Sequence, residues 1–155
     1  MSRTTIAPIR KEFQVAASQE TAFKIFTEKM DLWWPRSHHV GACPMTETVL
    51  EPGVNGRWYT KHEDGSEVNV GYVMTWDPFG LLVLVWQVNA NFKYDPAVIS
   101  EVEIQFIPEG TGITRVKFEH KDLDRLGDGG KAIESMDGGW GMILNLYKDL
   151  IEKSL

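Results

Sequence analysis

The stretch KAIESMDGGWGMILNLYKDLIEK, residues 131–153, decides the fold of this chain. Its apolar residues recur at intervals of three and four, the spacing that places side chains on one face of an α-helix. The segment predicts an amphipathic helix about 34 Å long at 1.5 Å per residue. Its apolar face comprises Ile133, Met136, Trp140, Ile143, Leu144, Tyr147, Leu150 and Ile151.

Three glycines interrupt this pattern, at Gly138, Gly139 and Gly141. Each is unfavourable in a helix interior by about 1 kcal/mol relative to alanine. Two interpretations follow. The helix begins only after Gly139, or the small residues allow it to lie close against a sheet.

Ahead of this helix the apolar period changes to two, which is typical of β-strands. Turn residues such as Asn55-Gly56 separate the segments. The clearest strand spans 67–76, and it is expected to direct Val68, Val70, Tyr72, Met74 and Trp76 to one face. Strands are predicted over 6–15, 46–51, 57–61, 67–76, 81–88, 98–107 and 113–120, and a first helix over 19–30 with Ser18 as its N-cap.

This order of elements predicts the architecture. Alternating strands need one apolar partner layer, and the terminal helix is long enough to supply it. We therefore expect a single α+β domain over residues 1–155, with a curved antiparallel sheet of about six to seven strands around the C-terminal helix. Large, irregular facing side chains favour a cavity between the two layers.

Composition narrows the function classes. The chain has 155 residues, a net charge of -6 and a pI of about 5.2, and an acidic chain without basic clusters argues against nucleic-acid binding. A single cysteine, Cys43, excludes an internal disulfide and fits a reducing compartment. No apolar run approaches the length of a membrane span or resembles a secretory signal. We expect a cytoplasmic protein without a membrane span.

Several motifs resemble one known family. They are WWP at 33–35, GRW at 56–58, FIPEGTGITRV at 106–116 and GW at 139–140. Over residues 9–151 the chain resembles the activator of heat-shock-protein-90 ATPase homologue-like family of the START-like, or SRPBCC, superfamily. The resemblance implies a helix-grip fold with a deep hydrophobic cavity beneath the C-terminal helix. The superfamily includes lipid carriers, polyketide cyclases, hydroxylase components, hormone receptors and chaperone activators, so a stress-response role is one of several implied functions.

Strand parity and helix phase direct many large aromatic side chains toward one interior. One interpretation is plain core packing, and the other is a cavity for a hydrophobic or aromatic small molecule. No cofactor is expected. The residues expected to contact such a ligand are Trp34, His39, Trp58, Tyr72, Met74, Trp76, Trp86, Phe106, Phe118, His120, Met136 and Trp140.

The histidines are candidates for proton transfer or metal binding. His120 is in phase with inward-facing neighbours, so it is either a buried hydrogen-bonded side chain or a polar anchor or general base with a pKa lowered by burial. His38 and His39 precede Cys43 without the spacing of a metal site, and no metal is expected.

No catalytic constellation is evident, and binding of a hydrophobic small molecule is the leading hypothesis. One alternative is a small cyclase or hydrolase that uses His120 or Tyr72. Another is a co-chaperone that activates a heat-shock ATPase, with a chaperone as its partner. Enzyme activity and oligomeric state stay open at this stage.

Overall fold

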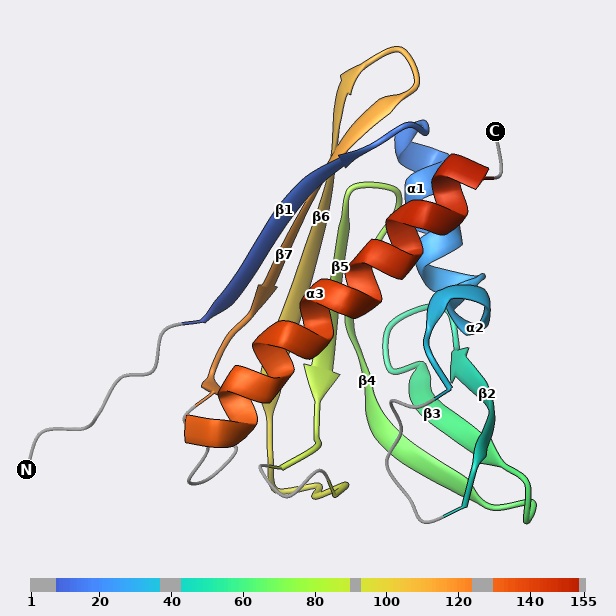
Figure 1. The fold of residues 1–155 in the computed structure, drawn as a ribbon, viewed down its shortest axis with the longest axis vertical. Helices are drawn as coiled ribbons and strands as arrows, with labels where there is room; N and C mark the ends of the chain where they lie inside the picture. The colour runs from blue at the N-terminus through green and yellow to red at the C-terminus, as the bar shows by residue number, and fades with distance from the viewer. Residues whose placement is uncertain (1–7, 37–42, 90–92, 124–129, 154–155) are drawn as a thin grey trace, which may run out of the picture.

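The computed structural model describes residues 8–36, 43–89, 93–123 and 130–153, and the elements follow the predicted order (Figure 1). Each predicted strand and helix has a counterpart within a few residues of its expected bounds. The elements are β1 (Ile9–Val15), α1 (Gln19–Thr27), α2 (Met30–Trp33), β2 (Met45–Leu50), β3 (Arg57–His62), β4 (Glu67–Asp77), β5 (Leu81–Trp86), β6 (Ser100–Gly110), β7 (Ile113–His120) and α3 (Gly130–Lys153).

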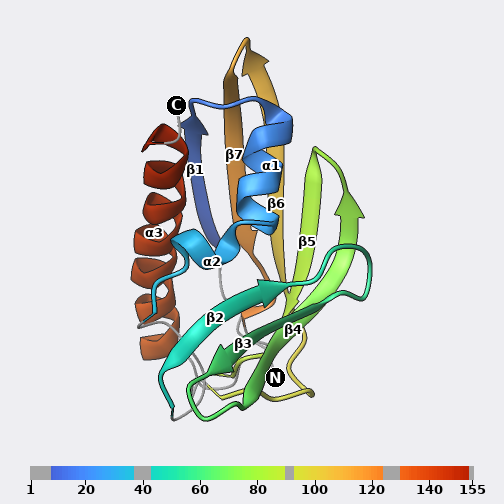
Figure 2. The ribbon, with the colours of Figure 1, turned by 90° about the vertical axis from the view of Figure 1, so that its right-hand side faces the viewer.

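The seven strands form one antiparallel sheet in the order β1-β7-β6-β5-β4-β3-β2. The sheet is curved, and α3 lies across its concave face while α1 and α2 cover one end (Figures 1 and 2). Most neighbouring strands are joined by short turns. The strands β1 and β2, which α1 and α2 separate along the chain, lie at opposite edges of the sheet. This arrangement confirms the predicted α+β helix-grip fold.

The terminal helix is continuous from Gly130 to Lys153, so the interpretation that it begins after Gly139 is wrong. The glycines also have a different role from the one expected. A Cβ atom at Gly138 would meet no atom within 4 Å, and one at Gly141 would lie 3.9 Å from the Lys11 side chain. At these two positions a small residue is therefore not required for the helix to approach the sheet.

The first predicted helix is divided in two. Ser18 is its N-cap, as expected, and accepts a 3.2 Å hydrogen bond from the backbone N–H of Thr21. The helix α1 ends at Thr27, and the one-turn α2 follows. Trp34 then adopts an extended conformation before Pro35, because a residue that precedes proline is disfavoured in the α region.

The strand β4 departs from regular alternation. Two β-bulges each shift the two-residue period by one. Trp58 and Tyr59 of β3 pair with Gly71 and Asn69, which leaves Val70 as the first bulge, and Val73 and Thr75 pair with consecutive residues of β5, which leaves Met74 as the second. Val73 is fully buried, its neighbour Tyr72 faces the opposite side of the sheet, and Met74 is 38% exposed. The prediction that Tyr72 and Met74 face the terminal helix is therefore wrong, whereas Trp76 packs against the core as expected.

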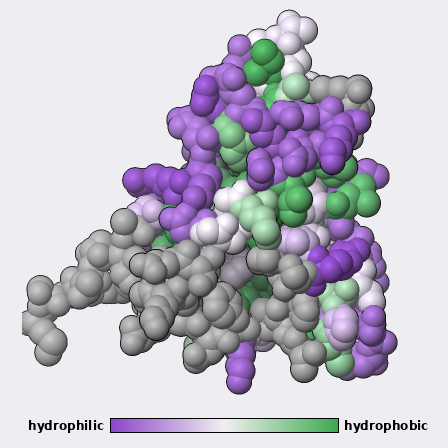
Figure 3. Space-filling view, in the orientation of Figure 1, coloured by the Kyte–Doolittle hydropathy of each residue, from purple (hydrophilic) through white to green (hydrophobic). Residues whose placement is uncertain are grey.

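The outer surface is largely polar. The face shown in Figure 3, which includes the outer side of α3, is mostly hydrophilic with separate hydrophobic areas. On the convex side of the sheet, Arg115 pairs with Glu109 at 2.8 Å and Lys121 with Glu103 at 3.2 Å. Within the described part of the chain, no helix combines the length and the apolar character that a bilayer crossing needs.

Candidate functional site

A transverse row of residues crosses the concave face of the sheet. Trp58 of β3 pairs with Gly71 of β4, Gly71 pairs with Trp86 of β5, and Trp86 pairs with Ser100 of β6. Residues paired in this way point to the same side of the sheet. Gly71 has no side chain, so the two indoles on its flanking strands meet with their centroids 5.6 Å apart. A Cβ atom at Gly71 would lie 1.7 Å from the carbonyl oxygen of Val85, which excludes any other residue here without a backbone shift.

Two further tryptophans complete a closed arrangement that we name the four-indole cluster, Trp34, Trp58, Trp86 and Trp140. Its consecutive centroid separations are 5.7, 5.6, 5.4 and 5.7 Å, starting from the pair of Trp34 with Trp58 and ending with that of Trp140 with Trp34. The interplanar angles lie between 59° and 89°, in the tilted and edge-to-face range that aromatic pairs favour. The four rings come from β3, β5, α3 and the residue that follows α2. The cluster therefore joins the sheet to both helical layers.

A buried polar chain lies beside this cluster. The indole N–H of Trp140 donates to Nδ1 of His120 at 3.2 Å, and Nε2 of His120 lies 2.9 Å from the hydroxyl oxygen of Ser100. That hydroxyl donates to the carbonyl oxygen of Trp86 at 3.1 Å. Because an indole nitrogen can only donate, Nδ1 accepts and the ring hydrogen is on Nε2. Both ring nitrogens of His120 and the hydroxyl group of Ser100 therefore have hydrogen-bond partners inside the protein.

His120 is fully buried, and burial lowers its pKa from 6.5 to about 3. The cause is the loss of hydration of the charged imidazolium. Near neutral pH the ring is neutral, and both of its nitrogens are engaged in hydrogen bonds. In this arrangement His120 has no free lone pair with which to remove a proton from a substrate.

The predicted site residues separate into two aromatic groups. Trp34, Trp58, Trp86 and Trp140 form the four-indole cluster, with His120 beside it. The second group surrounds α1, where Trp76 and Phe106 contact the ring of Phe23 at 5.2 and 5.4 Å, and Phe106 also contacts Phe26 at 5.8 Å. Trp33 stands between the groups, 5.9 Å from Trp34 and 4.9 Å from Phe26.

The remaining predicted residues have different positions. Phe118 packs against the four-indole cluster, 4.6 Å from its nearest ring, and Met136 is buried one turn before that ring on α3. Tyr72 and Met74 face away from the cluster because of the two bulges in β4. His39 lies outside the described residues.

Two residues that shape the site were not predicted as part of it. Gly71, which has no side chain, and Ser100, which has a small one, occupy the row positions between and beside the tryptophans. The signal for Gly71 was present, because glycine inside a strand often marks a close approach of the backbone. Ser100 had no comparable signal, since its role depends on the position of His120 on the neighbouring strand.

The Cys43 segment shows no reactive arrangement. A hydrogen bond to Asp64 raises the pKa of the Cys43 thiol, and the carboxylate itself has a pKa of about 2 because Ser66 donates to it. His62 donates from Nδ1 to the Cys43 carbonyl oxygen at 2.8 Å. In the described ranges no three His, Cys, Asp or Glu side chains are grouped so that they could hold a metal.

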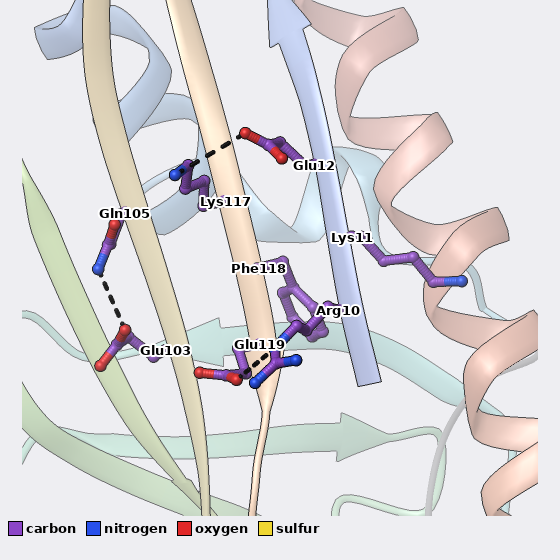
Figure 4. A pocket seen from close by; sticks show the side chains of 8 residues that line it. All are labelled: Arg10, Lys11, Glu12, Glu103, Gln105, Lys117, Phe118 and Glu119. Atoms are coloured by element: carbon purple, nitrogen blue, oxygen red, sulfur yellow. Dashed lines mark hydrogen bonds and ion pairs between the residues drawn. The ribbon is translucent and has the colours of Figure 1, made fainter. Parts of the chain in front are cut away.

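A separate hollow of about 550 Å³ lies over β1, β7 and β6 (Figure 4). It is hydrophilic, and its charged side chains pair with each other. Arg10 contacts Glu119 at 2.8 Å, and Lys117 contacts Glu12 at 3.9 Å. Lys11, although it borders the hollow, extends toward α3 and pairs there with Asp137. The hollow is therefore poorly matched to an apolar ligand, unlike the four-indole cluster on the other side of the sheet.

No protein-family model and no curated protein sequence matches the chain. Solved structures do match it. It is 34% identical to the anthrahydroquino-gamma-pyrone synthase Txn09, with 95% of this chain and 88% of that chain covered and a TM-score of 0.60. It is 33% identical to CalC, a self-sacrificing resistance protein from Micromonospora echinospora, with 96% of each chain covered and a TM-score of 0.72.

A third match is an HSP90 activator from Plasmodium falciparum. It is 16% identical, with 86% of this chain and 87% of that chain covered and a TM-score of 0.59. At this level of identity the match shows a shared fold.

Proposed function

The chain belongs to the START-like (SRPBCC) superfamily, and from this premise we propose that it binds a planar aromatic small molecule between its sheet and α3. The observation that carries the proposal is the four-indole cluster. Four large rings from four separate parts of the chain converge on one place, where smaller aliphatic side chains would pack more simply. Flat aromatic walls favour a flat aromatic guest, through the same edge-to-face and offset contacts that the indoles make with one another.

The character of the surroundings agrees with this ligand class. Trp58 and Trp140 are 1% and 4% exposed, and the adjacent His120 is neutral. A guest in contact with these side chains gains free energy from apolar burial, at about 25 cal/mol per Å² removed from water. Trp86 alone among the four indoles is only partly buried, so it marks the side from which a guest reaches the cluster.

Two solved structures above 30% identity also support a small-molecule function. The name of Txn09 denotes the synthesis of a fused aromatic product, and CalC is described as a resistance protein. For this chain we propose the binding of a compound of low molecular weight in its interior.

The two residues that the enzyme alternative invokes are poorly placed for proton transfer. His120 has both ring nitrogens engaged, and Tyr72 faces the outer side of the sheet. The co-chaperone alternative rests on a likeness of fold to an HSP90 activator, at 16% identity. Measuring the ATPase rate of a purified heat-shock ATPase with and without this chain tests it, and we expect an unchanged rate.

Ligand binding is tested by thermal-shift measurements and equilibrium dialysis against a panel of planar aromatic compounds and long-chain fatty acids. We expect planar aromatics to stabilise the fold, by about 2.7 kcal/mol at a concentration of one hundred times Kd. Trp86→Ala should weaken their binding at least tenfold. Leu146→Ala, a change on the exposed side of α3, is the matched control and should leave it unchanged.

Two results would contradict the proposal. One is a panel in which fatty acids stabilise the protein and planar aromatics do not. The other is binding that Trp86→Ala leaves intact and Leu146→Ala abolishes, which would place the ligand on the outer face of α3.

A further inference from the structure

The indole nitrogen of Trp58 is distinguished from the other buried polar atoms. Among the described residues, it is the one buried side-chain nitrogen or oxygen that has no hydrogen-bond partner. Other indoles of the interior donate to the protein itself: Trp33 to the Ile25 carbonyl, Trp86 to the Val88 carbonyl and Trp140 to His120. A buried donor without a partner is unfavourable in folding, so it points to a partner that the folded chain does not supply.

The Trp58 indole nitrogen lies within the four-indole cluster. The ring of Trp58 lies between those of Trp34 and Trp86, with centroid separations of 5.7 and 5.6 Å, and its side chain is 1% exposed. Gly71 is its paired neighbour on β4 and contributes no side chain. The unpaired N–H therefore belongs to the same cluster of rings that the proposed aromatic ligand would contact.

The chemistry of the missing partner follows from these surroundings. An indole N–H donates and cannot accept, so the partner presents a hydrogen-bond acceptor. A carboxylate or phosphate would bury a charge among uncharged rings and beside the neutral His120, which is strongly unfavourable. A phenolic hydroxyl would bring its own donor into an apolar environment. An uncharged carbonyl oxygen on an aromatic framework satisfies the indole and adds no unpaired group.

We infer that the ligand of the proposed function is an aromatic ketone or quinone whose carbonyl oxygen accepts a hydrogen bond from Nε1 of Trp58. This inference rests on the proposed function and makes it more specific. The rings of the ligand contact the neighbouring indoles, and its carbonyl group determines its orientation in the site. Trp58 is then the residue that distinguishes a ketone from a hydrocarbon of the same shape.

The experiment uses two probes that differ in this one group. Fluorenone carries a carbonyl where fluorene has a methylene, on the same three-ring frame. Dissociation constants are measured by tryptophan fluorescence for the unaltered protein, for Trp58→Phe and for Trp33→Phe. The last is the matched control, because it removes a buried indole N–H that already has a partner inside the protein.

We expect Trp58→Phe to weaken fluorenone binding about fivefold to tenfold relative to its effect on fluorene, the factor that one neutral hydrogen bond supplies. The comparison of the two probes cancels the loss of ring area, which affects both equally. Trp33→Phe should change the two affinities by the same factor.

A second measurement does not depend on any variant being well folded. In the ¹⁵N spectrum of the unaltered protein, the indole N–H signal of Trp58 should move downfield with fluorenone and not with fluorene. Absence of that difference overturns the inference, as does an equal loss of both affinities in Trp58→Phe, and in both cases the proposed function stands. If neither probe binds the unaltered protein, the proposed function fails together with the inference.

Discussion

The indole N–H of Trp140 lies 3.2 Å from Nδ1 of His120, and this hydrogen bond joins α3 to β7 inside the aromatic interior. Both side chains are buried, at 4% and 0% exposure. A directional bond in an otherwise apolar contact allows fewer ways of placing the helix on the sheet than ring packing alone. The pair therefore specifies both the rotation of α3 and the tautomer of the histidine.

Replacement of His120 tests this role. His120→Leu leaves the Trp140 N–H without an acceptor, and we expect it to lower the free energy of unfolding by about 1–3 kcal/mol. His120→Gln retains an acceptor for Trp140 and a donor for Ser100, so its effect should be smaller. Urea unfolding of the three proteins measures the difference. Equal losses in both variants would show that the hydrogen bonds contribute little.

The low pKa of His120 predicts a dependence of stability on pH. In the folded state the pKa is about 3, against 6.5 for an unperturbed histidine. Between these values the unfolded chain binds a proton that the folded chain does not, so the free energy of unfolding decreases as the pH falls below 6.5. The slope contributed by this group is at most about 1.4 kcal/mol per pH unit, and it vanishes above neutrality.

Urea unfolding from pH 7.5 to 5 measures this slope, and His120→Gln is the control. The variant should show a flatter profile than the unaltered protein over the same range. A profile that is the same in both proteins would assign the dependence to other groups.

Two glycine substitutions should have opposite effects. Gly71→Ala places a Cβ atom 1.7 Å from the backbone oxygen of Val85, and we expect a loss of about 1–3 kcal/mol or more from the resulting strain. Gly138→Ala meets no atom within 4 Å and replaces a glycine in a helix interior, so it should stabilise the fold by up to about 1 kcal/mol. Thermal unfolding of both variants provides the comparison. Destabilisation by Gly138→Ala would contradict the open surroundings of that position.

The bulge in β4 can be tested by charge. Met74→Lys introduces the ammonium group on the exposed side and should change stability by no more than about 0.5 kcal/mol. Val73→Lys places the same group at a fully buried position, where an unpaired charge strongly disfavours folding. Expression level and urea unfolding report the contrast. A tolerated Val73→Lys together with a disruptive Met74→Lys would restore the regular alternation that the sequence pattern predicted.

Local periodicity in the sequence predicted some elements correctly and missed the irregularity of one strand. The period of three and four from Ile133 to Ile151 predicted α3 correctly, because a long apolar stripe can be buried only when the segment is helical. The strand β7 has the bounds expected from its alternation, Ile113 to His120. In β4 the same reasoning failed at Tyr72 and Met74, since the two bulges depend on pairing with β3 and β5 and leave no mark in the period itself.

In the candidate site, too, the sequence predicted which residues are buried but not which of them contact one another. Trp58, Trp86 and Trp140 were expected inside, and they are, because large apolar rings leave water wherever a partner layer exists. Phe106 and Trp76 are also inside but belong to a different group around α1. The alternation along a strand predicts which side of the sheet a side chain faces. It does not predict which distant ring that side chain will contact there.

The amino-acid sequence by itself determined the order of elements, the single curved sheet and the terminal helix that crosses it, because each of these depends on local periodicity and on the burial of apolar surface. Only the tertiary structure decided that Gly71 lets two tryptophans meet, that His120 is saturated by Trp140 and Ser100, and that the Trp58 N–H is left without a partner. Those relationships join residues far apart in the chain, and they exist only once strand register and helix rotation have brought the atoms within contact distance.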